Sequence, residues 1–87
     1  MAPPTLPPLP LSADQWKRIA KQLGLSPQQR RIAELILRHQ CDKQIAATME
    51  IKLPTVRTYI GRMFDKLHVA DREELILLVF KLSHDVP

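Results

Sequence analysis

The stretch that decides the fold covers residues 42–67 and reads DKQIAATMEIKLPTVRTYIGRMFDKL. Asp42 is placed to cap a short helix, because its carboxylate can accept the unpaired backbone N–H groups of the first turn. Ile45 and Met49 follow at helical spacing and give this helix an apolar face. Pro54 suits the first position of a second helix, since its ring fixes φ and its missing N–H would have no partner there. The stretch therefore predicts two helices joined by a short turn.

The second of these helices has an apolar back and a small, cationic front. Its apolar side chains recur at helical spacing and form one stripe, made of Val56, Ile60, Met63, Phe64 and Leu67. At about 100° per residue, the opposite side carries Thr58, Gly61, Arg62 and Asp65. One flank of that side holds Arg57, and the other holds Thr55, Tyr59 and Lys66. Such a helix can pack on a core and present its front to a DNA groove.

With their neighbours, these residues resemble the LuxR/FixJ-type helix-turn-helix family of bacterial transcription regulators. The resemblance runs from Leu25 to about Leu82 and rests on many short pieces together. The pieces are Leu25-Ser26-Pro27, Arg30, Arg31, Ile32, Leu35, Ile36, Lys43-Gln44-Ile45-Ala46, Ile51, Thr55-Val56-Arg57-Thr58-Tyr59, Lys66-Leu67, Val69, Arg72 and Glu74. The resemblance implies sequence-specific binding of double-stranded DNA, with a recognition helix at about residues 54–67 in the major groove.

Position by position, the resemblance also implies individual DNA contacts. Phosphates are expected near Lys43, Lys52 and Thr55, around the start of the recognition helix, where the helix N-terminus attracts anions. Arg57 and Thr58 are expected to contact base edges, which carry the sequence information.

For the remaining residues of the same helix, the resemblance implies several different roles. Tyr59 and Arg62 are expected on phosphates or base edges, and Lys66 on a phosphate. Val56 is placed as much for the core as for a thymine methyl group, and the core interpretation is favoured. Asp65 stands where the family commonly has a basic residue, so near a phosphate it would repel the DNA.

Proline and capping signals divide the chain into three parts. Residues 1–11 hold five prolines and no charged side chain, which predicts an extended arm or linker end, or a disordered tail without function. Residues 12–24 are expected to form an additional helix, which a capping box of Ser12 and Gln15 opens and Gly24 ends. Residues 25–87 form the helix-turn-helix domain.

Local signals also set the helix boundaries within this domain. A Ser-Pro-Gln-Gln capping box at 26–29 opens a helix to about His39. His68 stands where the family usually has glycine and is expected to end the recognition helix in the left-handed conformation. Asp71 caps a last helix that runs to about Ser83. With the additional helix these make five helices and no strand, so the predicted fold class is all-α, a compact helical bundle.

Length and composition indicate one small domain. The chain has 87 residues, of which 45% are hydrophobic and 25% charged, an ordinary composition for a globular protein. Its one cysteine, Cys41, excludes an internal disulfide and suits a reducing compartment. No apolar stretch is long enough to span a bilayer, and the N-terminus lacks the basic-then-apolar order of a signal peptide. The expected location is the cytoplasm.

The charge is unevenly distributed. Residues 1–68 carry eleven Lys and Arg against five Asp and Glu, whereas residues 69–87 carry two against four. The basic part contains the predicted recognition helix, and a cationic surface favours contact with phosphates.

No enzyme, metal or cofactor site is expected. His39 and Cys41 are close in sequence, but two ligands cannot complete a zinc site. The chain has only Gly24 and Gly61 as glycines, too few for a glycine-rich phosphate loop, and it shows no set of nucleophile, base and orienting residue.

The last helix is apolar on two sides, which predicts that it is buried on two sides. One face has the residues of a core helix, namely Leu75, Leu78, Val79 and Leu82. The second apolar surface consists of Ile76, Leu77 and Phe80. In the family that the chain resembles, this helix pairs with its copy across a two-fold axis, which implies a homodimer. Alternatively, the additional helix covers Ile76 and Phe80 within one chain, through Trp16 and Leu23.

Two functions of different classes are therefore considered. The first is a DNA-binding transcription regulator, with RNA polymerase or another regulator as a further candidate partner. The second is a protein-interaction adaptor that keeps the helix-turn-helix fold, as in sigma region 4, but binds DNA weakly or not at all. The first function is favoured by Arg57, Thr58, Arg62 and Lys66, and the second by Gly61 and Asp65.

Overall fold

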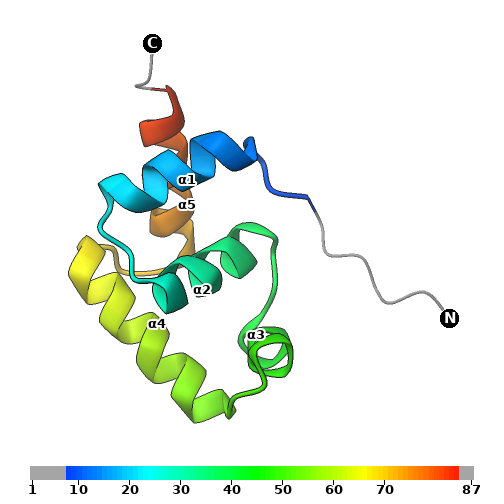
Figure 1. The fold of residues 1–87 in the computed structure, drawn as a ribbon. Coiled ribbons are helices and arrows are strands. Elements are labelled where there is room, and N and C mark those ends of the chain that lie inside the picture. Colours follow the sequence, from blue (N-terminus) through cyan, green and yellow to red (C-terminus); the bar gives the residue numbers. More distant parts are fainter. Residues whose placement is uncertain (1–7, 85–87) are drawn as a thin grey trace, which may run out of the picture.

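The computed structural model describes residues 8–84, which fold into five helices (Figure 1). In chain order the helices are α1 (Ala13–Gln22), α2 (Pro27–Leu37), α3 (Asp42–Met49), α4 (Leu53–Leu67) and α5 (Arg72–His84). The described residues form no strand, and the predicted all-α fold class is confirmed. The arm expected at residues 1–11 lies mostly outside the described residues, although Leu9 and Leu11 pack against the core.

Capping boxes open the first two helices, as the sequence predicts. The Ser12 hydroxyl accepts a hydrogen bond from the Gln15 N–H at 3.1 Å, and the Gln15 side chain accepts one from the Ser12 N–H at 3.0 Å. Ser26 and Gln29 form the same two bonds at 3.2 and 3.0 Å, with Pro27 as the first helical residue. Each box satisfies backbone donors that have no partner within the first turn.

The start of α3 differs from the prediction. Cys41 is the N-cap residue, and Asp42 is already the first helical residue. The Gln44 side chain accepts a hydrogen bond from the Cys41 N–H at 2.8 Å. The predicted cap by Asp42 is wrong, because its carboxylate pairs with Arg57 and Arg72 instead.

The helices α1 to α4 all end in the same backbone motif. The chain turns at a left-handed residue, and the next N–H bonds back to a carbonyl five residues earlier at 3.0–3.1 Å. The left-handed residues are Gly24, His39, Glu50 and His68, with φ values of 69°, 63°, 56° and 57°. The predictions for Gly24 and His68 are confirmed, whereas the left-handed turns at His39 and Glu50 were not predicted. The predicted cap of α5 is also present, since Asp71 Oδ1 accepts from the Glu74 N–H at 2.9 Å.

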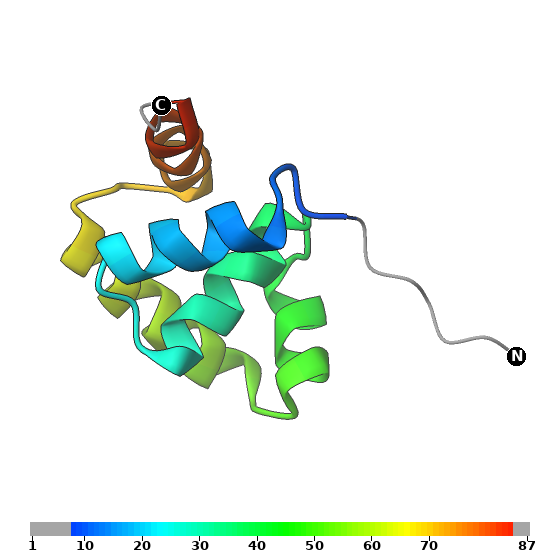
Figure 2. The ribbon, with the colours of Figure 1, turned by 45° about the horizontal axis from the view of Figure 1, so that its top comes forward.

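The core is built around α2, which Figure 1 shows between α1 and the α3–α4 pair. Its buried side chains are Ile32, Ala33, Leu35, Ile36 and Leu37. Packing pairs α2 with α4, α3 with α4, and α1 with α5. In Figure 2, which looks along α5, this helix stands at one edge of the molecule next to α1. The additional helix α1 contributes Trp16, Ile19 and Ala20 to the core, so it is an integral part of the fold.

Candidate nucleic-acid interface

The helices α3 and α4 form a helix-turn-helix. At the end of α3, Glu50 adopts the left-handed conformation, and the Ile51 N–H donates to the Ala46 carbonyl at 3.0 Å to close the turn. Lys52 is then extended, and α4 begins at Leu53 and packs back against α3. Figure 1 shows α4 at the outside of the molecule, so one of its sides faces away from the body.

The back of α4 is the apolar stripe that the sequence predicts. Val56 and Met63 are fully buried, and Ile60 is 8% exposed. Phe64 and Leu67 are half-buried and pack against the same core. Val56 is therefore a core residue, as favoured from the sequence. The alternative contact of its side chain with a thymine methyl group has no support in this structure, because the side chain has no exposed surface.

The front of α4 is exposed and polar. Its exposed residues are Arg57, Thr58, Gly61, Arg62 and Asp65. The Thr58 hydroxyl donates to the Pro54 carbonyl at 3.0 Å, so its oxygen remains available as an acceptor for a donor on a base edge. At Gly61, an added Cβ would meet no atom within 4 Å, so the front is open there.

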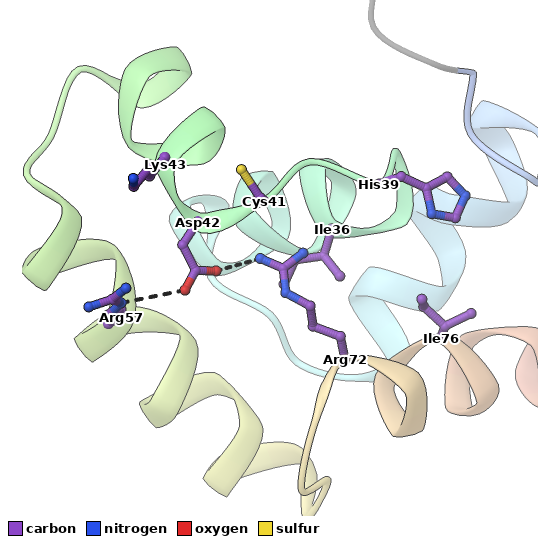
Figure 3. Close-up of a pocket in the computed structure, with 8 residues that line it drawn as sticks. All are labelled: Ile36, His39, Cys41, Asp42, Lys43, Arg57, Arg72 and Ile76. Atoms are coloured by element: carbon purple, nitrogen blue, oxygen red, sulfur yellow. Dashed lines mark hydrogen bonds and ion pairs between the residues drawn. The ribbon is translucent and has the colours of Figure 1, made fainter.

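Arg57 is the most prominent cation of this front, and it lies beside a carboxylate. Its side chain is 65% exposed, and its Nε lies 3.6 Å from Asp42 Oδ2. The other oxygen of Asp42 lies 2.5 Å from Nη2 of Arg72, the first residue of α5. Figure 3 shows the Asp42 carboxylate between these two arginines, with Lys43 on the same side of Asp42 as Arg57. The sequence predicted Arg57 on one flank of the outward side but not its pairing with Asp42, whose carboxylate was assigned to the helix cap.

Lys66, predicted to contact a phosphate, is engaged within the chain instead. Its ammonium group donates to the Gly24 carbonyl, just beyond α1, and to the Gln29 side chain at 3.3 Å. These two residues are 42 and 37 positions away in the sequence. The C-terminal end of α4 is thus bonded to the α1–α2 connection and to the first turn of α2.

The other predicted DNA contacts divide between two sides of α4. Lys43 and Lys52 are exposed near its start, and Thr55 is half-buried in its first turn. Tyr59 and Arg62 instead line a small pocket at the start of α2, together with Ser26, Gln28, Gln29 and Ile32. Arg62 thus belongs to the exposed front and also borders this pocket, whereas Lys43 and Lys52 are exposed near the start of α4.

A comparison with protein-family models identifies this arrangement. Residues 23–79, more than half of the chain, match the GerE model, described as bacterial regulatory proteins of the luxR family. The chain belongs to the luxR family. It is a LuxR-type helix-turn-helix DNA-binding domain of bacterial transcription regulators, and the family is not enzymatic. No curated protein and no solved structure shows a significant match to it.

The family assignment confirms the resemblance inferred from the sequence, with somewhat different limits. The matched region begins two residues before Leu25 and ends at Val79, within α5. The whole of α1 lies ahead of the matched region. Among residues 8–84, no three His, Cys, Asp or Glu side chains gather as metal ligands, and no helix is long and apolar enough to cross a membrane.

The last helix of this LuxR-type domain leaves part of its apolar surface uncovered. Leu77 is 66% exposed and Phe80 is 37% exposed. Ile76 is half-buried and lines an open pocket with Ile36, His39, Cys41, Asp42, Lys43, Arg57 and Arg72 (Figure 3). Helix α1 packs against α5 but leaves Leu77 and Phe80 exposed. Of the second apolar surface predicted for this helix, two residues face outward and one lies toward the body.

Proposed function

We propose that this domain binds a specific sequence of double-stranded DNA by placing the N-terminal half of α4 in the major groove. The observation that carries the proposal is the exposed front of α4, where Arg57 and Thr58 lie side by side on a helix whose back is fixed in the core. An arginine can bond to guanine O6 and N7 together, and the Thr58 oxygen can accept from an amino group on a base. The proposed phosphate contacts are Lys43, Lys52, Thr55, Tyr59 and Arg62, and Tyr59 and Arg62 can also reach base edges.

Titration of labelled duplexes with the chain tests this proposal. A duplex selected from a random library should bind more tightly than random DNA, and binding to both should weaken as salt rises. If Lys43, Lys52 and Arg62 neutralise three phosphates, a fourfold rise in salt should weaken the binding of one module by about 40-fold. Salt-independent or undetectable binding would contradict the proposal and leave the adaptor function, in which α4 contacts a protein such as a sigma factor.

We further propose that two copies of the domain pair through α5. Leu77 and Phe80 are three residues apart on a helix, so they lie on one face and can meet the same residues of a second copy. Ile76 borders this face from its half-buried position. Such a dimer would bind two inverted half-sites about one helical turn, or roughly 34 Å, apart. Its place of action would be the bacterial cytoplasm, with RNA polymerase as a further partner.

Sedimentation of the chain at tens of micromolar tests the pairing. The parent should sediment as a dimer, and Leu77→Glu should give a helical monomer, because pairing would bury the new charge. Gln22→Glu adds the same charge at an exposed position of α1 and should leave the dimer intact. A parent that remains monomeric at this concentration contradicts the proposal.

A further inference from the structure

We infer that Asp42 is a positioning residue that sets the base preference of this domain through Arg57. The inference rests on the proposed function, because it concerns how Arg57 contacts a base. The geometry points to Asp42 because its carboxylate is the group that approaches Arg57 from outside α4, with Oδ2 3.6 Å from the Arg57 Nε (Figure 3). At this separation the contact is an ion pair rather than a hydrogen bond, so it orients the guanidinium without immobilising it.

Asp42 is itself held in place from two directions. Its backbone begins α3, and its Oδ1 is paired with Arg72 Nη2. The other terminal nitrogen of Arg72, Nη1, donates to the Gln40 carbonyl at 2.6 Å. The carboxylate is only about one-third exposed, at 33%. The α2–α3 connection and the start of α5 together fix the oxygen that faces Arg57.

This arrangement leaves the terminal nitrogens of Arg57 available for a base. The contact with Asp42 is made through Nε, and within residues 8–84 neither Nη atom donates a hydrogen bond. The two Nη groups are the donors that can form a pair of bonds to one guanine. Because Nε faces the carboxylate, the long side chain loses part of its rotational freedom before DNA arrives, and less entropy is lost on binding.

The carboxylate also disfavours the competing use of Arg57. A flexible arginine at the edge of a groove can pair with a phosphate instead of a base. A phosphate that approached Arg57 from the side of Nε would meet the negative charge of Asp42. Asp42 should therefore weaken nonspecific binding and strengthen the preference for one base pair.

The substitution Asp42→Asn tests this inference, because it removes the charge while keeping the size and an acceptor for Arg72. Affinities are measured for the selected duplex and for the same duplex with the Arg57-dependent base pair changed. We expect the ratio of the two affinities to fall by roughly fivefold or more, and binding to random DNA to tighten. Asp42→Glu retains the charge, so the ratio of its affinities for the two duplexes should stay close to that of the parent.

Two controls separate positioning from general effects. Asp65→Asn removes the same charge from the front of α4 and should leave the ratio unchanged, even where it tightens binding at low salt. In an Arg57→Ala background, Asp42→Asn should change the ratio no further, whereas a purely structural role would lower affinity in both backgrounds.

The outcomes distinguish this inference from the proposed function. If the parent binds its selected duplex specifically and Asp42→Asn keeps the full ratio, the inference is overturned while the proposed function stands. The inference is also overturned if Asp42→Asn lowers the ratio of the two affinities by the same factor in the parent and in the Arg57→Ala background. A parent with no base preference contradicts the proposed function, and the inference fails with it.

Discussion

The two ends of α4 carry cations of the same charge in different surroundings. Near the N-terminal end, the Arg57 side chain is 65% exposed, and its Nε lies 3.6 Å from Asp42 Oδ2. Near the C-terminal end, the Lys66 ammonium donates to the Gly24 carbonyl and to the Gln29 side chain. One cation is available to a partner molecule, and the other is occupied within the chain.

This difference shows that a cationic residue on the polar side of a helix is not necessarily available to bind DNA. The sequence predicted both residues as DNA contacts. The C-terminal end of α4, however, lies beside the end of α1, where free backbone carbonyls attract a positive charge. The N-terminal half of α4 thus forms the open part of the interface, and its C-terminal end joins the helix to the body.

The largest expected effect concerns the back of α4, which supports both ends. Met63 is fully buried, so Met63→Ala should lower the free energy of unfolding by about 2–5 kcal/mol, measured by urea denaturation. Its exposed neighbour is the matched control, and Arg62→Ala should change that free energy by less than about 0.5 kcal/mol. Similar losses in the two variants would contradict the division of α4 into a buried back and an exposed front.

The next effect concerns the N-terminal half of α4. Arg57→Ala should weaken binding to the preferred duplex by about 1–3 kcal/mol and relax the preference at one base pair, because the paired bonds to a guanine are lost. Titration of a set of duplexes with single base changes measures both quantities. If the same substitution at Lys66 relaxed the preference as much, the comparison between the two ends would fail.

A smaller effect is expected at the other end. Lys66→Ala should lower the free energy of unfolding by about 0.5–1 kcal/mol, because the Gly24 carbonyl loses a charged donor at an exposed position. The slope of log affinity against log salt should change by less than one unit, since the parent ammonium is already occupied. If Lys66→Ala left the stability unchanged but altered this slope by a full unit, Lys66 would have to leave Gly24 and bind a phosphate in the complex.

The sequence predicts this fold well where neighbouring residues determine it. The capping boxes at Ser12 and Ser26 depend on residues three positions apart, and the stripe of α4 depends on helical spacing. Both kinds of pattern are visible in a few residues. The left-handed turns at His39 and Glu50 were not predicted, because neither residue is glycine and only the finished backbone requires the conformation.

The candidate site is less predictable because its contacts join distant parts of the chain. Asp42 has the residue type of a helix cap, yet its carboxylate pairs with Arg72, 30 positions later. Lys66 has the residue type and face of a phosphate contact, yet its partners are Gly24, in the α1–α2 connection, and Gln29, in the first turn of α2. In both cases the charged group binds a residue from a distant part of the chain, and not the partner that its local sequence pattern predicts. The family resemblance could locate the interface, but not these two pairings.

The smallest expected effect concerns Asp65, on the exposed front next to Lys66. It is eight residues beyond Arg57, and a rise of 1.5 Å per residue places it about 12 Å further along the helix. That distance is about one Debye length at 0.1 M salt and well within one at 0.01 M. Asp65→Lys should therefore tighten binding to random DNA several-fold at about 0.01 M salt and less than about twofold at 0.15 M. A large gain at 0.15 M would place a phosphate beside Asp65 and extend the DNA interface to the C-terminal end of α4.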